Sequence, residues 1–181
     1  MQINVTQLKR YSIPLLLLIL FFIGFFVRAS LIDPDTNYPG NLKSANALYH
    51  SIISQHIADS GDTLHYPYFL AENHDDIISI VSQHFAITGA SIIKLTGLGD
   101  WQISALLISL LSALTIPLIF LIIRRIFKSD AIALLSAALV TLPLPLNVWL
   151  YQTYIGLWLQ SAGLTVLLVS IYFLVRAFQE R

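Results

Sequence analysis

The sequence contains no cysteine and few charged residues. Without cysteine the chain forms neither disulfides nor thiolate-bound metal centres, and cysteine usage does not indicate a redox compartment. Charged residues make up 11% of the 181 residues, whereas a soluble domain carries roughly 25%. The formal net charge of zero gives no electrostatic basis for binding nucleic acid. Because 56% of the residues are hydrophobic, the composition predicts an integral membrane protein.

Four apolar runs are predicted to be membrane-spanning helices, at residues 12–32, 102–123, 131–148 and 155–175. The first run follows Lys9 and Arg10 and is interrupted only by Arg28. We interpret it as a retained span, because Arg28 occupies the place where a signal peptide would carry small residues for cleavage. The long Arg28 side chain is expected to extend to the membrane interface.

The third apolar run has recognisable boundaries at both ends. Ser129 and Asp130 precede it and form a favourable N-terminal cap. Pro143 and Pro145 near its end are expected to bend or stop the helix.

A fifth run, residues 77–96, is long enough to span a membrane but contains Gln83, His84 and Lys94. Cytoplasmic loops carry an excess of Lys and Arg, so the distribution of basic residues indicates whether this run crosses the membrane or lies on its surface. If this run does not cross and the N-terminus is cytoplasmic, seven basic residues are cytoplasmic and three are outside; crossing reverses that split. The run is therefore predicted to be an amphipathic helix on the outer face, with both termini cytoplasmic.

The predicted architecture is an all-α, single transmembrane domain over residues 1–181, with about four transmembrane helices and one large outer loop at 33–100. A second amphipathic helix is predicted at 42–57 and is ended by the polar stretch 59–62. The loop contains all five histidines and eight of the ten acidic residues: Asp33, Asp35, Asp59, Asp62, Glu72, Asp75, Asp76 and Asp100. A structured acidic loop of this length is often functional.

Asp33 and Asp35 begin the loop in the stretch Ser-Leu-Ile-Asp-Pro-Asp-Thr-Asn-Tyr-Pro-Gly-Asn, residues 30–41. A carboxylate at the membrane interface can act as a general base or bind a divalent cation such as Mg or Mn. The alternative interpretation is an ordinary helix exit, because Asp, Pro and Asn are common turn residues.

Other polar clusters give weaker predictions. No two histidines stand four residues apart on one helix, so the spacing does not favour a histidine-based metal site. Asp75 and Asp76 are interpreted as capping charges at a helix N-terminus. Arg124, Arg125 and Lys128 are interpreted as determinants of membrane topology and not as a phosphate site.

The chain resembles the N-terminal part of the GT-C superfamily of membrane glycosyltransferases, which includes oligosaccharyltransferase catalytic subunits and protein O-mannosyltransferases. In these families the first span leads into a large outer loop with an acidic motif and membrane-parallel helices. Oligosaccharyltransferase catalytic subunits often read D-P-x-x-N-Y at this place, and residues 33–38 here read D-P-D-T-N-Y. The run from Ser104 to Pro143 is similar to the second and third spans, joined by a short basic turn.

The resemblance implies a sugar transfer from a polyprenyl-phosphate-linked donor at the outer membrane face. Asp33 would be the catalytic or metal-linked carboxylate. If the motif is instead taken as Asp-x-Asp, Asp35 would be the favoured carboxylate. The stretch 149–156 has no acidic residue where oligosaccharyltransferases carry a second acidic motif. This departure leaves open a metal-free, single-base mechanism or a loss of activity. These enzymes also have more spans, so we expect a fragment, one part of a split enzyme or a reduced relative.

Two other functions remain open from the sequence. One is a non-catalytic four-span subunit that binds a further membrane subunit through its outer loop. The other is a small transporter component, which is less favoured because the centres of the predicted spans lack ionisable residues.

Overall fold

The computed structural model describes residues 5–30, 45–65, 80–142 and 158–180. Within these ranges the chain is helical and contains no strand, which confirms the predicted all-α class for this part of the chain. The helices are α1 (Val5–Ala29), α2 (Ala45–Ser60), α3 (Ile80–Thr96), α4 (Asp100–Phe127), α5 (Asp130–Thr141) and α7 (Trp158–Gln179).

Three helices are long and apolar enough to cross a membrane, over Tyr11–Ala29, Gln102–Phe127 and Gln160–Gln179. They correspond to the first, second and fourth predicted spans. The third prediction falls on α5, which has 12 residues and at about 1.5 Å per residue is shorter than a bilayer core. It ends at Thr141, with Leu142 as its C-terminal cap, and residues 143–148 of that prediction lie outside the described residues.

The cap before α5 agrees with the sequence prediction. The Ser129 hydroxyl accepts a hydrogen bond from the backbone N–H of Ile132, which satisfies one donor of the first helical turn. Arg124 reaches the same turn through an ion pair with Asp130, with Nε to Oδ1 at 2.6 Å. The short basic connection between α4 and α5 is therefore held in place at both of its ends.

Helix α4 is the centre of the arrangement and contacts all the other described helices. Its buried positions include many small residues, among them Ser104, Ser109, Ser112 and Ala113. Small side chains let neighbouring helix backbones approach closely, which is how membrane helices commonly pack. Thr165 of α7 adds a hydrogen bond to the backbone carbonyl of Leu111, at 3.1 Å.

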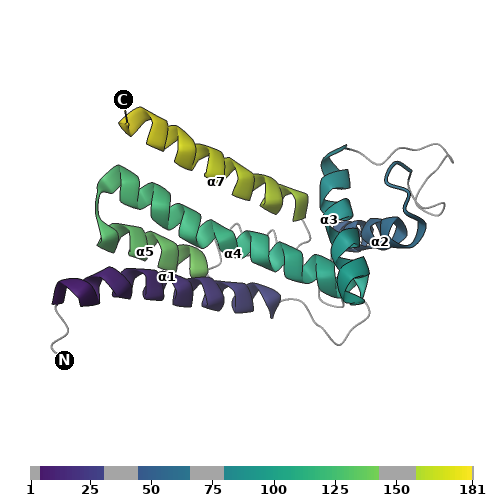
Figure 1. The fold of residues 1–181 in the computed structure, drawn as a ribbon, viewed down its shortest axis with the longest axis horizontal. Helices are drawn as coiled ribbons and strands as arrows, with labels where there is room; N and C mark the ends of the chain where they lie inside the picture. The colour runs from purple at the N-terminus through teal and green to yellow at the C-terminus, as the bar shows by residue number, and fades with distance from the viewer. Residues whose placement is uncertain (1–4, 31–44, 66–79, 143–157, 181) are drawn as a thin grey trace.

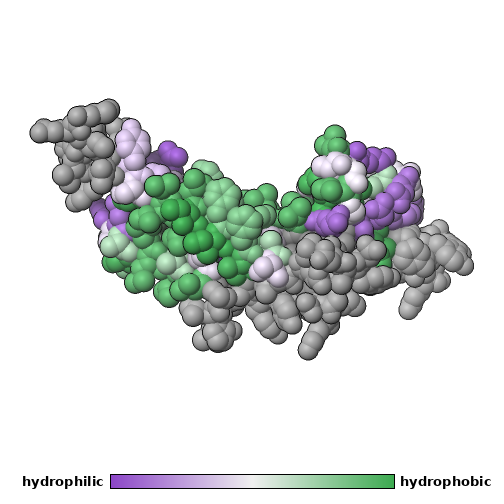
Figure 2. Space-filling model, turned by 90° about the horizontal axis from the view of Figure 1, so that it is seen from below, coloured by the Kyte–Doolittle hydropathy of each residue, from purple (hydrophilic) through white to green (hydrophobic). Residues whose placement is uncertain are grey.

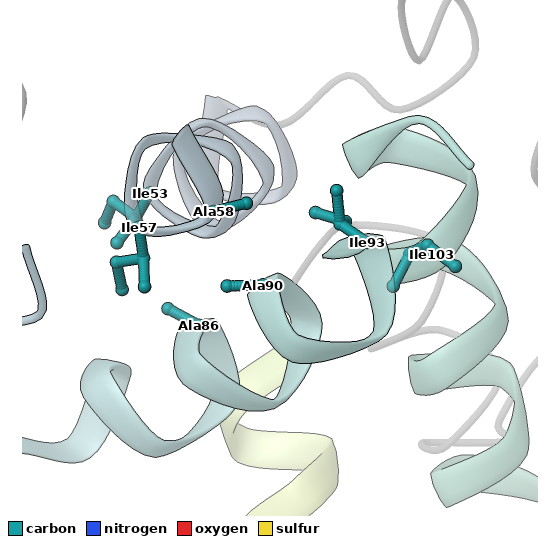
Figure 3. Close-up of a cluster of buried hydrophobic side chains, with 7 residues drawn as sticks. All are labelled: Ile53, Ile57, Ala58, Ala86, Ala90, Ile93 and Ile103. Atoms are coloured by element: carbon teal, nitrogen blue, oxygen red, sulfur yellow. The ribbon is translucent and has the colours of Figure 1, made fainter. Parts of the chain in front are cut away.

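Helices α2 and α3 form a separate pair beside the N-terminal end of α4 (Figure 1). The pair corresponds to the two amphipathic helices predicted for the outer loop. Its apolar core consists of Ile53, Ile57, Ala58, Ala86, Ala90 and Ile93, joined by Ile103 of α4 (Figure 3). The apolar faces of α2 and α3 are thus turned toward each other.

The hydropathy of the surface divides the molecule along its length. Figure 2 shows hydrophobic residues over the middle of the helical bundle and hydrophilic residues near one of its ends and over the α2–α3 pair. The exposed apolar side chains of α1 include Leu15, Leu18 and Phe22. A large apolar belt of this kind fits a helix bundle that faces lipid.

Candidate functional site

The predicted catalytic residues Asp33 and Asp35 lie outside the residues that the structure describes. The same holds for Asp75, Asp76 and the acid-free stretch 149–156. The described residues on either side of the acidic motif are the last turns of α1 and the start of α2. The candidate site is therefore built from the elements that flank the motif.

The last turn of α1 is fixed by Arg28, whose side chain is completely buried. Its Nε donates a hydrogen bond to the Ser112 hydroxyl of α4, at 2.8 Å. Its Nη1 donates to the carbonyl of Gly24 at 3.0 Å, and its Nη2 donates to the carbonyl of Val140 of α5 at 3.2 Å. The expectation that Arg28 extends to the membrane interface is wrong, because these three acceptors hold it between helices.

The Arg28 contacts determine where α1 can end. A buried guanidinium group costs free energy unless its donors are paired, so the three acceptors favour one packing of α1 against α4 and α5. Buried Ile116 and Phe120 of α4, with Ala133 and Ala137 of α5, form an apolar core beside this network. Arg28 therefore anchors the helix end from which the chain continues into the acidic motif.

The packing of α2 against α3 depends on a glycine. A methyl group on Gly89 of α3 would lie 2.8 Å from the hydroxyl oxygen and 3.2 Å from the Cβ of Ser54. Ser54 is fully buried in α2, and its hydroxyl donates to the backbone carbonyl of His50 at 3.0 Å. The two helices can approach this closely because Gly89 has no side chain.

His50 is buried in the α2–α3 pair beside aromatic rings. Its ring centroid is 5.5 Å from that of Tyr49 and 5.9 Å from that of Phe85, both in edge-on geometry. Burial lowers the pKa of His50 from 6.5 to about 4, because an imidazolium ion loses hydration there. Near neutral pH this residue is therefore a neutral part of the packed pair.

Acidification is expected to destabilise the α2–α3 pair through His50. The folded state keeps His50 neutral, whereas the unfolded chain binds a proton at this residue below pH 6.5. The free energy of unfolding is therefore highest above pH 6.5 and decreases as the pH is lowered to about 4. The loss amounts to about 3 kcal/mol. Thermal unfolding in detergent micelles, followed by circular dichroism between pH 7 and pH 4.5, measures it.

Two matched variants identify the titrating group. His50→Gln should remove most of the pH dependence over this interval, whereas His56→Gln, at a partly buried position of the same helix, should retain it. An unchanged pH dependence in His50→Gln would show that another group is responsible.

A short turn after α2 holds a second charged group. The Asp62 carboxylate accepts hydrogen bonds from the backbone N–H groups of Leu64 and His65, at 2.8 and 3.1 Å. It also lies 2.9 Å from Nδ1 of His65. These hydrogen bonds lower the pKa of Asp62 to about 2; the one from Leu64 has the largest effect, and those from His65 add to it. The carboxylate therefore remains charged at physiological pH.

The Asp62 turn is attached to α3. The side-chain amide of Gln83 donates a hydrogen bond to the carbonyl of Thr63. Gly61, which ends α2 as predicted, has a φ of +76°, a conformation that glycine adopts without strain. The turn therefore fixes one end of the α2–α3 pair.

Several groups were missed or misjudged from sequence. Among the described residues, no three of His, Asp or Glu lie close enough to hold a metal ion. Arg28 was expected at the interface, and only its position in an apolar run could have indicated burial. The cavity that Arg124, Arg125 and Lys128 line together was not predicted; their interpretation as topology determinants stays a prediction.

No protein-family model, curated protein or solved structure matches the chain.

Proposed function

We propose that the chain is a GT-C-type glycosyltransferase, or the N-terminal portion of one, that transfers a sugar from a polyprenyl-phosphate-linked donor at the outer membrane face. The observation that supports this proposal best is the shared location of two features. The end of α1 held by Arg28 and the α2–α3 pair lie toward the same end of the bundle (Figure 1). The D-P-D-T-N-Y stretch therefore starts from the end that carries the folded loop helices.

The proposed chemistry uses Asp33 as a general base. Its carboxylate accepts the proton of the acceptor nucleophile, which attacks the anomeric carbon of the sugar. The bond from that carbon to the phosphate oxygen breaks, and the lipid phosphate leaves with the electron pair. Asp35 is the alternative base, and in that case a Mg²⁺ or Mn²⁺ ion held by Asp33 would stabilise charge on the leaving phosphate.

The proposed topology has both termini in the cytoplasm and the α2–α3 pair outside. Arg124 and Arg125 lie in the last turn of α4, Lys128 caps its C-terminus, and Arg176 lies in the last turn of α7. These cations support the cytoplasmic side for that end of the bundle. The same proposal includes the third predicted span, residues 131–148, in addition to the three candidate spans of the structure.

A second candidate function is a non-catalytic subunit that binds a further membrane protein through the α2–α3 pair. Three large apolar side chains near this pair are exposed: Leu64 at 54%, Leu95 at 85% and Leu98 at 45%. Exposed apolar groups on a folded element fit a contact with a partner or with lipid.

Sugar transfer in membranes distinguishes the two candidates. Membranes that contain the full chain are incubated with a labelled polyprenyl-phosphate sugar, and the labelled product is quantified against membranes without the chain. A product that requires both the chain and the donor supports the transferase. Absence of a product, together with co-purification of a membrane protein that Leu95→Gln abolishes, supports the subunit.

A further inference from the structure

A basic cavity lies between α4 and α7 at the end of the bundle opposite the α2–α3 pair. It has a volume of about 380 Å³ and is lined by Leu121, Arg124, Arg125, Lys128, Tyr172 and Gln179. Three of these residues are cations and none is a carboxylate. α4 and α7 are both candidate membrane spans, and the cavity lies at their C-terminal ends.

Arg125 joins the two walls of the cavity. Its Nη2 lies 2.9 Å from Oε1 of Glu180, and its Nε donates to Oε1 of Gln179 at 3.0 Å. The side-chain amide of Gln179 donates in return to the backbone carbonyl of Arg125, at 2.9 Å. These contacts hold the C-terminal ends of α4 and α7 together, so the cavity has a defined shape.

Two carboxylates neutralise only part of the positive charge here. Asp130 pairs with Arg124, while Glu180 is shared between Arg125 and Arg176. Four cations (Arg124, Arg125, Lys128 and Arg176) and two anions leave a net charge of +2 for these described residues. An anion that enters the cavity therefore meets an excess of positive charge.

Lys128 has an unusual backbone conformation. It caps the C-terminus of α4 with φ 52° and ψ 30°, in the left-handed region. Glycine or asparagine is the usual residue at such a cap, and a lysine there is strained. Its exposed side chain lines the cavity, so a strained backbone position adds a cation to this site.

We propose that this cavity binds the phosphate headgroup of an anionic phospholipid. Arg124 and Lys128 would contact the phosphate oxygens, and Leu121 and Tyr172 would pack against the apolar part of the lipid. Basic pockets between membrane helices on the cytoplasmic side commonly bind such headgroups. The position at the ends of two candidate spans and a volume well above that of a phosphate ion favour a lipid over free phosphate.

Lipid retention tests the proposal. The full chain is placed in nanodiscs of phosphatidylcholine with a minor fraction of phosphatidylglycerol, and the bound lipids are identified by native mass spectrometry after release. The chain should retain phosphatidylglycerol in preference to phosphatidylcholine. Arg124→Gln and Lys128→Gly should each lower that preference by about fivefold, the effect expected for one basic residue at a membrane surface.

The variants are chosen so that misfolding does not explain a loss. Lys128→Gly relieves the left-handed strain and should not lower the melting temperature. Lys94→Gln removes the same charge from an exposed position of α3 and should leave lipid preference unchanged. Equal retention of both lipids by the parent chain, or an unchanged preference in both cavity variants, would overturn the proposal. Inorganic phosphate that displaces phosphatidylglycerol at millimolar concentration would assign the cavity to a soluble phosphate instead.

Discussion

Replacement of Asp33 by Asn is expected to lower the rate of sugar transfer by at least about a hundredfold. The amide keeps the size of the side chain but cannot accept the proton of the acceptor nucleophile. The fold should be unaffected, because Asp33 follows the end of α1 and that end is anchored by the hydrogen bonds of Arg28. The rate is measured as labelled product formed per minute in membranes with equal amounts of the protein.

Asp59→Asn provides the matched control, since Asp59 is an exposed carboxylate at the end of α2 in the same predicted loop. Its side chain accepts a hydrogen bond from Gln55, and its loss should leave the transfer rate within about twofold, the scale of a surface change. Asp35→Asn shows which acid is the base: the larger loss identifies it. Full activity in both Asp33→Asn and Asp35→Asn would contradict the catalytic assignment.

Gly24→Ala is expected to destabilise the helical bundle by about 2 kcal/mol through overpacking. The added methyl group would overlap Cδ1 of Ile116 and lie 3.0 Å from Nη1 of Arg28. Ile116 is fully buried, so it has little room for another rotamer. The same methyl group would disturb the hydrogen bond from Arg28 to the Gly24 carbonyl, and so would loosen the end of α1.

Gly163→Ala is the control for Gly24→Ala. Gly163 lies within α7, and a methyl group there would meet no atom within 4 Å. Alanine has a higher helix propensity than glycine, so this variant should be neutral or slightly more stable. Unfolding in mixed micelles with increasing SDS, followed by circular dichroism, compares the two. Equal midpoints for the two variants would mean that α1 does not pack on α4 as described.

Much of the fold was predictable because its signals are local. Long apolar runs identified α1, α4 and α7, and the polar stretch ending in Gly61 and Asp62 identified the end of α2. The Ser129 cap identified the start of α5. Each of these features depends on neighbouring residues along the chain, which a sequence shows directly.

The details that depend on contacts between distant residues were not predictable. Arg28 reaches Ser112 and Val140, which are 84 and 112 positions away in the sequence. The basic cavity forms only because α7 returns beside α4 and brings Gln179 to Arg125. Ile53 and Ile57 stand four residues apart, a helical spacing that the sequence shows directly, but the burial of His50 and Ser54 in the same helix is not visible in the sequence. Polar residues on a packed face follow from the partner helix, which the sequence pattern does not specify.

The most direct test of the proposed function is photo-crosslinking with a polyprenyl-phosphate sugar that carries a photoreactive group on the sugar. The full chain in native membranes is irradiated, digested and mapped by mass spectrometry. The proposal predicts crosslinks within residues 31–65, which contain Asp33 and the start of the α2–α3 pair, and their loss when unlabelled donor is added in excess. Crosslinks confined to the Arg124 end of α4, or crosslinking that excess donor does not reduce, would contradict it.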